Sequence, residues 1–246
     1  MLFDEEKNNG AKVQSCNLNE ELGMVHYIFS DKTGTLTKNI MDFKKFTAGE
    51  YSYGVSNPSP REYEPGITNI NFECPLFERD WTEGIKEKGK PANPLLETMI
   101  LILGVCHTVV VEKKDENIVY NASSPDELAL VNAARHFGLT FIDRDDESNI
   151  ILHNKFTGKN IKYELLNVIE FTSTRKRMSV IVRAPDNKIM IFTKGADTII
   201  LPRIAHGQEF LVDKTLKYIK NFAVEGLRTL LVVQKEVSSE FYNEWS

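Results

Sequence analysis

Several features are scarce in this sequence, and each scarcity disfavours a class of protein. The 246 residues include only three cysteines, at an odd count and at spacings that suit neither a disulfide framework nor a zinc motif: Cys16, Cys74 and Cys106. Basic residues do not predominate either, because 30 Lys and Arg against 35 Asp and Glu give a net charge of −5. We therefore expect a protein of a reducing compartment, with no nucleic-acid partner.

Long apolar runs are also missing. The most apolar stretch, 99–111, contains His107 and is shorter than the roughly 20 apolar residues that a membrane helix needs. The first ten residues, MLFDEEKNNG, are polar and acidic, unlike a signal peptide. With 41% hydrophobic and 26% charged residues, the chain has the composition of a soluble globular protein. We expect one large domain, or one domain and part of another, that does not itself cross a membrane.

The chain is predicted to divide near residue 40. Within residues 1–40, the apolar run MVHYIF at 24–29 predicts a short buried strand that opens into a loop at Ser30 and Asp31. Residues 41–246 would form a second domain. A helix start at Ser238, shortly before the chain ends, predicts a truncated C-terminus.

The second domain is predicted to combine helices with strands paired in hairpins. Residues 54–94 hold six of the nine prolines, which indicates a loop-rich stretch or an insertion with one short helix. Ser124 can serve as a helix N-cap, with Pro125 at the first helical position and Glu127 placed for a capping box. Helices are expected at 95–106, 124–137 and 197–223, and strands at 42–47, 107–112, 117–121, 140–143, 150–153, 161–171, 178–183, 188–192 and 229–234.

Residues 30–37, SDKTGTLT, carry the clearest chemical signal. A carboxylate at the end of a strand can attack the γ-phosphorus of ATP and become an acyl phosphate, which makes Asp31 a candidate nucleophile. Lys32 can offset charge on the transferring group, and Gly34 lets backbone N–H groups approach phosphate oxygens. The Asp31 carboxylate and the Thr33 carbonyl supply the oxygens that Mg²⁺ prefers. These residues alone leave a structural alternative open, in which Asp31 and Thr33 only form an Asx turn.

Seven consecutive residues, DKTGTLT at 31–37, resemble the phosphorylation motif of the P-type ATPases. The resemblance extends over about residues 15–246 and favours one subfamily, the phospholipid-translocating ATPases or lipid flippases. The blocks ELLNVIEF and TRKRMSVIVR favour flippases over ion pumps. The segments that carry it are NLNEELGMVHYIFS (17–30), SSPDELALVNAAR (123–135), ELLNVIEFTSTRKRMSVIVR (164–183), KGADTII (194–200) and EGLRTL (225–230).

The resemblance implies an α/β (more strictly α+β) fold with two parts. Residues 1–40 would include the first strand of a haloacid-dehalogenase-like phosphorylation domain. Residues 41–246 would be the nucleotide-binding domain, a twisted and mostly antiparallel sheet flanked by helices. Asp31 would accept the phosphoryl group, and Thr33 would ligate Mg²⁺ through its carbonyl. Because Thr33 stands where related phosphatases carry a second aspartate, the phosphoenzyme is expected not to hydrolyse at once.

Nucleotide must be held without a P-loop, because neither G-x-x-x-x-G-K-[ST] nor G-x-G-x-x-G occurs. Phe171, followed by TSTRKR, could stack on adenine; the alternative is a core phenylalanine beside a solvated basic turn. Lys194, next to Gly195, could reach a ligand through the gap that the glycine leaves, or it is a surface lysine before a helix. Arg228, after Gly226, could make forked contacts with phosphate oxygens or an ordinary surface salt bridge.

Glu127 has two competing interpretations. The capping box accounts for it without any ligand, whereas the resemblance places a nucleotide-contacting glutamate in SPDE at 124–127. We expect a cavity that joins Phe171 with Lys194 and Arg228. The resemblance implies an ATP site lined by Glu127, Phe171, Lys194 and Arg228, with Ser173, Lys176 and Thr229 as weaker neighbours. Histidines such as His107, His136 and His153 lack paired ligands at metal spacing and are assigned to structure.

The predicted function is therefore that of an ATP-binding catalytic fragment of a phospholipid-transporting P-type ATPase. ATP would phosphorylate Asp31, and the full-length, multi-pass membrane protein would couple this step to lipid movement toward the cytosolic leaflet, with an accessory subunit as a further candidate partner. The fragment would lie on the cytosolic face and would not turn over alone, since later family segments such as TGDK are absent. Alternatives are a cation-transporting P-type ATPase fragment, a soluble phosphotransferase or a nucleotide-binding module without catalysis.

Overall fold

The computed structural model describes residues 3–4, 8–10, 23–59, 62–114 and 117–246. It divides into two units, residues 1–39 and 40–246, and each is described by itself. In the first unit, β1 (Phe3–Asp4) pairs antiparallel with β2 (Asn9–Gly10). Cys16 and residues 17–22 of the approach to the DKTGTLT motif lie outside the described residues.

The buried strand predicted over 24–29 does not form. This segment has no strand structure, and Ile28 and Phe29 are 86% and 96% exposed. A strand is stable where a neighbouring strand satisfies its backbone N–H and C=O groups, and none of the described residues pairs with this segment. The segment is apolar, as the prediction required, but no neighbouring strand that could pair with it and bury it lies among the described residues.

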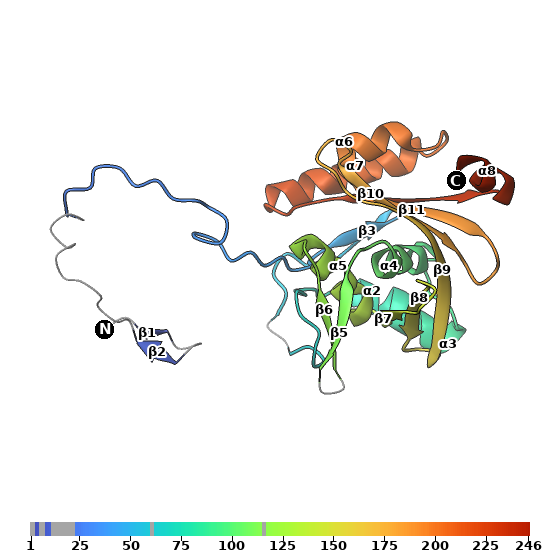
Figure 1. The fold of residues 1–246 in the computed structure, drawn as a ribbon, viewed down its shortest axis with the longest axis horizontal. Helices are drawn as coiled ribbons and strands as arrows, with labels where there is room; N and C mark the ends of the chain where they lie inside the picture. The colour runs from blue at the N-terminus through green and yellow to red at the C-terminus, as the bar shows by residue number, and fades with distance from the viewer. Residues whose placement is uncertain (1–2, 5–7, 11–22, 60–61, 115–116) are drawn as a thin grey trace. The chain divides into compact units, whose positions relative to one another are not determined.

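A six-stranded antiparallel sheet forms the frame of the second unit (Figure 1). Strands that follow one another along the chain are also neighbours in the sheet, in the order β7-β8-β9-β10-β11-β12. The central strand β10 is buried along almost its whole length, as expected for a strand covered on both faces. The strands are β7 (Leu139–Arg144), β8 (Ile150–Asn154), β9 (Lys159–Ile169), β10 (Arg177–Arg183), β11 (Ile189–Gly195) and β12 (Leu231–Val237).

Helices cover both faces of this sheet. Figure 1 shows α4 (Leu95–Val105) and α5 (Pro125–His136) on one side, and α6 (Asp197–Ile200) and α7 (Glu209–Val224) on the other. The single helix predicted over 197–223 is interrupted, because a short 3-10 turn, η2 (Leu201–Arg203), follows α6, and Gly207 at φ +85° precedes α7. The last helix is α8 (Ser239–Trp245), in which the Ser238 side chain caps the Phe241 N–H. The expected twisted antiparallel sheet flanked by helices is confirmed.

The proline-rich stretch contributes more to the core than the sequence predicted. A continuous helical run lies where a loop with one short helix was expected: α2 (Pro75–Phe77), the π-helix η1 (Glu78–Glu83) and α3 (Gly84–Lys88). Phe72, Phe77 and Trp81 are buried and pack against other aromatic rings, including that of Phe137. The prolines interrupt regular structure in this stretch, but its buried aromatic side chains pack it into the core. Two hairpins complete the unit: β3 (Phe46–Ala48) with β4 (Tyr51–Tyr53), and β5 (Val110–Lys114) with β6 (Asn117–Asn121).

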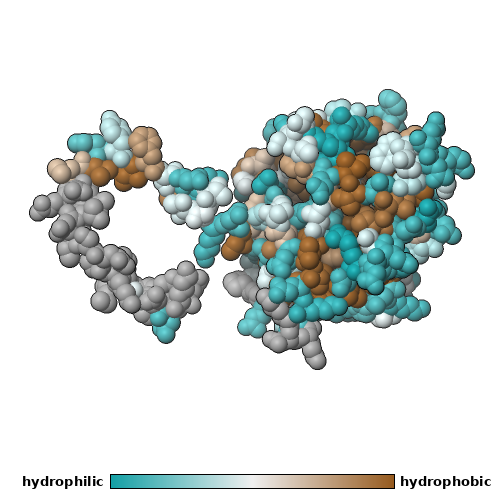
Figure 2. All heavy atoms as spheres, in the orientation of Figure 1, coloured by the Kyte–Doolittle hydropathy of each residue, from teal (hydrophilic) through white to brown (hydrophobic). Residues whose placement is uncertain are grey.

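The outer face of the second unit is mixed in polarity. Figure 2 shows hydrophilic side chains over most of one face, with apolar patches between them. Single exposed apolar side chains are normal on soluble domains. Within the described ranges, no helix is both long enough and apolar enough to cross a bilayer.

Candidate nucleotide site and phosphorylation motif

Neighbouring strands of the sheet begin and end together at one edge. β9 ends just before the loop 170–176, from which β10 starts at Arg177. Arg177 pairs with Gly195 at the end of β11, and Gly195 pairs with Leu231 at the start of β12. Because antiparallel neighbours alternate in direction, this single sheet edge collects the loop 170–176, the end of β11 and the segment leading into β12.

Most of the predicted nucleotide-contacting residues lie at this sheet edge. The loop between β9 and β10 carries Phe171, which is 61% exposed and so is not a core phenylalanine. Ser173 and Lys176 are exposed on the same loop. On the far side of β11, exposed Arg228 and half-buried Thr229 immediately precede β12. The edge therefore offers an exposed aromatic ring and several polar or cationic side chains from segments distant in sequence.

Gly195 lets two of these segments meet. A Cβ at this position would lie 2.6 Å from the Arg177 Cβ and 2.8 Å from the Lys176 carbonyl oxygen. The Ala196 N–H donates to that same Lys176 carbonyl at 3.1 Å. The space that the glycine leaves is thus filled by the 170–176 loop, and it is not the opening for a ligand that the sequence suggested.

Lys194 is buried, contrary to the alternative of a surface lysine. Only 9% of the residue is exposed, and its Nζ lies 2.7 Å from Oε1 of Glu127. The other carboxylate oxygen, Oε2, accepts hydrogen bonds from Thr108 Oγ1 at 2.7 Å and from Thr108 N–H at 3.2 Å. Both carboxylate oxygens of Glu127 therefore accept hydrogen bonds, one from the Lys194 ammonium and the other from the hydroxyl and backbone N–H of Thr108.

The capping box predicted for α5 is not formed. Ser124 does occupy the N-cap position and Pro125 begins the helix, but the Ser124 side chain makes no capping hydrogen bond. Glu127 turns toward Thr108 and Lys194. A bond from the N-cap backbone N–H would also be charge-assisted, but only the Lys194 ammonium carries a full opposite charge, which makes it the stronger partner for this carboxylate.

Burial and charge act in opposite directions on Glu127. Burial alone would raise the pKa of its carboxyl, but the Lys194 ammonium and the hydrogen bonds from Lys194 and Thr108 hold the pKa below its usual value. Two buried residues near this ion pair, Cys106 and His107, follow α4 in the chain, and burial favours their uncharged forms. Burial lowers the pKa of His107 to about 3 and raises that of Cys106 to about 11. The ion pair is thus flanked by two buried side chains that carry no charge, and the half-buried guanidinium of Arg144 lies beside them.

His107 is a structural histidine, as the sequence suggested. Its Nδ1 accepts from the Val109 N–H at 3.1 Å, so Nε2 carries the proton and donates to the Gly104 carbonyl at 3.0 Å. The ring also packs edge-on against Phe141, with 4.5 Å between ring centroids. His107 is fully engaged inside the fold.

A second ion pair joins the start of α5 to the segment before β12 at the surface. Arg228 Nη1 lies 3.3 Å from Oδ2 of Asp126, the residue before Glu127. A third contact fixes the turn that carries Arg228, because Lys45 Nζ donates to both carboxylate oxygens of Glu225, at 2.6 and 2.7 Å. Gly226, at φ +72°, allows the chain to turn between these two anchors.

Sequence reasoning missed Thr108, Asp126 and Lys45 as parts of this arrangement. Asp126 carried a signal, since it stands beside Glu127 within the SPDE segment that the resemblance had singled out. Thr108 and Lys45 carried none. Each contacts a residue far away along the chain, and only folding makes those contacts.

The DKTGTLT motif forms a compact turn in the first unit. The Lys32 carbonyl accepts from the Leu36 N–H at 3.0 Å and the Thr37 N–H at 3.2 Å, and Gly34 adopts φ +79°. The Asp31 side chain is exposed and, within the described part of the chain, makes no hydrogen bond. The Asx-turn alternative is therefore wrong, and the carboxylate faces solvent.

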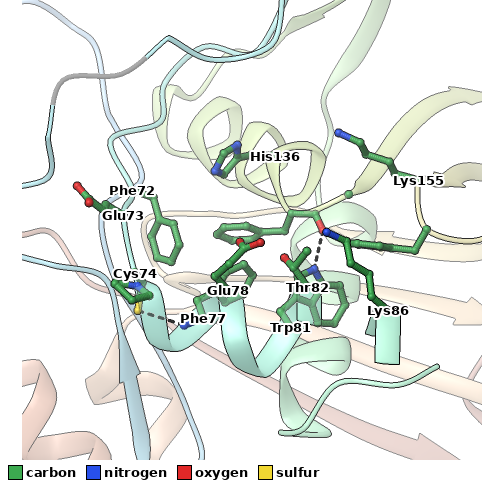
Figure 3. A pocket seen from close by; sticks show the side chains of 14 residues that line it. Phe72, Glu73, Cys74, Phe77, Glu78, Trp81, Thr82, Lys86, His136 and Lys155 are labelled. Atoms are coloured by element: carbon green, nitrogen blue, oxygen red, sulfur yellow. Dashed lines mark hydrogen bonds between the residues drawn. The ribbon is translucent and has the colours of Figure 1, made fainter. Parts of the chain in front are cut away.

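A cavity of about 630 Å³ lies in another part of the second unit (Figure 3). Phe72, Phe77 and Trp81 form much of its wall, and Lys86 and Lys155 lie at its side. None of the residues predicted to bind nucleotide lines it. It is therefore not the cavity that was expected between Phe171, Lys194 and Arg228, and that cavity stays a prediction. In this structure the Lys194 side chain forms an ion pair with Glu127.

Similarities to known proteins agree with this arrangement. Residues 95–245 match the family described as P-type ATPase, cytoplasmic domain N. The whole chain is 41% identical to part of the human protein named Phospholipid-transporting ATPase ID and covers 21% of it. It is 39% identical to part of Phospholipid-transporting ATPase DRS2 of Saccharomyces cerevisiae and covers 18% of that protein. The chain thus spans about a fifth of the length of the curated relatives it matches. It belongs to the P-type ATPase family and contains the cytoplasmic domain N of these enzymes.

Proposed function

We propose that this chain is the ATP-binding and phosphoryl-accepting part of a phospholipid-transporting P-type ATPase. The observation that carries the proposal is the sheet edge where exposed Phe171, buried Lys194 and exposed Arg228 come from three separate segments. The names of the relatives favour lipid transport over cation transport. The DKTGTLT turn favours a phosphorylated intermediate over a module that only binds nucleotide.

In the proposed nucleotide site, Phe171 stacks on the adenine ring and Glu127 accepts a hydrogen bond from the adenine amino group. Lys194 and Arg228 face the phosphates, where their positive charge offsets the net negative charge of the chain. Ser173, Lys176 and Thr229 are neighbours that add polar contacts. An exposed aromatic ring suits this role, since an adenine base can cover a ring that the fold leaves open.

The proposed reaction is a phosphoryl transfer to Asp31. One carboxylate oxygen of Asp31 attacks the γ-phosphorus, an O–P bond forms, and the bond between the γ-phosphorus and the β–γ bridging oxygen breaks, so that ADP leaves. The exposed carboxylate of Asp31, which makes no hydrogen bond to any residue that the structure describes, fits this role. Together with the Thr33 carbonyl it would supply oxygen ligands to a Mg²⁺ ion. When bound, Mg²⁺ would neutralise charge on the phosphates.

The whole protein is proposed to couple this phosphorylation to phospholipid movement toward the cytosolic leaflet. Residues 1–40 would belong to the phosphorylation domain and residues 41–246 to the nucleotide-binding domain on the cytosolic face of the membrane. Closure of the two domains would bring the γ-phosphate in line with Asp31. An accessory subunit remains part of the proposal for the whole protein.

Calorimetric titration of the 246-residue chain with ATP tests the nucleotide site. We expect weak binding that Phe171→Ala reduces by at least about tenfold, since stacking of one base on an aromatic side chain contributes roughly 1–3 kcal/mol. Phe210→Ala is a matched control, because Phe210 is 59% exposed and lies on α7. Equal ATP affinity in the Phe171→Ala and Phe210→Ala variants would remove Phe171 from the site.

Labelling with γ-labelled ATP tests the phosphoryl step. The chain alone is expected to form no stable acyl phosphate, because the further phosphate-binding segments of the family are absent from it. A hydroxylamine-sensitive label on the wild-type chain, lost in Asp31→Asn, would contradict this expectation and would identify Asp31 directly as the acceptor.

A further inference from the structure

Thr108 holds one face of the Glu127 carboxylate. Its side-chain Oγ1 and backbone N–H both donate to the same oxygen, Oε2, at 2.7 and 3.2 Å. The second oxygen, Oε1, is left to Lys194 alone at 2.7 Å. One carboxylate oxygen is therefore occupied by the fold, and the other faces a long, flexible side chain.

The segment that carries Thr108 is itself fixed on both sides. The Cys106 N–H donates to the Ile102 carbonyl at 2.9 Å, which continues the hydrogen bonding of α4. Arg144 donates to the carbonyl of His107 at 3.0 Å and to that of Val109 at 3.4 Å. Thr108 thus stands between two residues whose carbonyls accept hydrogen bonds from one half-buried guanidinium, and its two donors are preorganised.

We propose that Thr108 is a positioning residue for nucleotide recognition, which fixes Glu127 so that its Oε1 can accept the amino group of a bound adenine. The inference rests on the proposed nucleotide function and adds a residue to it. Lys194 pairs with Oε1, and its flexible side chain can move toward the phosphates when adenine arrives. Thr108 keeps Oε2 satisfied throughout this exchange, so that the carboxylate need not reorient.

The test compares two substitutions in the 246-residue chain by calorimetric titration with ATP and with ITP, whose base carries a carbonyl in place of the amino group. Thr108→Val removes the hydroxyl at nearly constant volume, and Thr108→Ser restores it. We expect the wild-type chain to prefer ATP over ITP. Thr108→Val should weaken ATP binding about tenfold, leave ITP binding within about twofold and so remove the preference, and Thr108→Ser should retain it.

Other outcomes overturn the inference in distinguishable ways. Equal losses of ATP and ITP binding in Thr108→Val would show a general structural role. An unchanged ATP preference, or no preference in the wild-type chain, would exclude positioning of Glu127 toward adenine while leaving ATP binding itself intact. A wild-type chain that binds neither nucleotide would overturn the proposed function as well. If Thr108→Val fails to fold, as judged by its thermal transition, Thr108→Ala supplies the same comparison.

Discussion

The proposed nucleotide site contains two ion pairs, and they differ sharply in their surroundings. Glu127 and Lys194 have side chains only 11% and 10% exposed, with 2.7 Å between their charged atoms. Asp126 and Arg228, which join the same helix α5 to the segment before β12, are 26% and 68% exposed and 3.3 Å apart. Adjacent carboxylates in one helix turn thus take part in a buried pair and a surface pair.

The difference in exposure predicts how much each ion pair contributes to the stability of the fold. Removing one partner of a buried pair leaves an uncompensated charge in a poorly solvated place, whereas an exposed pair is replaced by water at little cost. We therefore expect Lys194 to matter for folding as well as for ligand binding. Arg228 should matter for ligand binding alone.

The largest expected effect comes from Lys194→Met. This change preserves the length of the side chain but leaves the Glu127 carboxylate buried without its cation, and we expect a loss of about 3 kcal/mol in the free energy of unfolding. Urea denaturation at neutral pH measures it. Adding Glu127→Gln to the same variant should restore about 1 kcal/mol or more, because the neutral side chain no longer needs a counter-ion. A double variant less stable than Lys194→Met would show that packing, and not charge, controls this site.

A second effect concerns acid, because buried His107 lies beside Thr108 in the cluster around the buried pair. Burial depresses its pKa to about 3 in the folded chain, from 6.5 in its unperturbed form. Below pH 6.5 the unfolded chain therefore takes up a proton that the folded chain does not, and stability falls as the pH is lowered toward 3. The slope contributed by this one group is up to about 1.4 kcal/mol per pH unit.

Urea denaturation at about pH 7 and about pH 5 measures this slope. His107→Gln cannot titrate, so the difference in stability between the two pH values should shrink in this variant even if the variant is less stable at both. An unchanged difference would mean that His107 takes up its proton without unfolding. The buried cluster would then be more open to water than its contacts indicate.

The smallest expected effect is that of Arg228→Ala on stability. Because the pair with Asp126 is exposed, its loss should change the free energy of unfolding by no more than about 0.5 kcal/mol. ATP affinity, measured by the same titration as for Phe171, should nevertheless fall about tenfold if Arg228 contacts phosphate. A large loss of stability would make the two ion pairs equivalent and would end the contrast between them.

Much of the fold in the second unit followed from the sequence. The periodicities predicted α4, α5 and each of the six strands of the sheet to within a few residues, because each of these elements buries an apolar face along its own length. The long helix predicted over 197–223 was wrong in its middle, where Pro202 and Gly207 interrupt it. The stretch 54–94 was underestimated because prolines obscured the buried aromatics between them.

The candidate site was predictable only in part. Phe171, Lys194 and Arg228 were chosen because of a family resemblance, and the sheet register then brings their segments to one edge. The sequence pattern at Glu127 favoured a capping box that does not form. Local pattern reasoning compares a side chain with its neighbours in the chain and has no access to a lysine 67 positions away.

By itself, the sequence determined the order of helices and strands, the P-type ATPase motif and the composition of a chain whose core can form without disulfides. Those properties depend on contacts within about one helical turn or one strand, which hydrophobic periodicity records. Only the tertiary structure decided that Glu127 is paired and not capping, that Phe171 is exposed and that Thr108 takes part at all. Each of these depends on donors and on burial supplied by distant segments, and their relative strength is set only when the chain has folded.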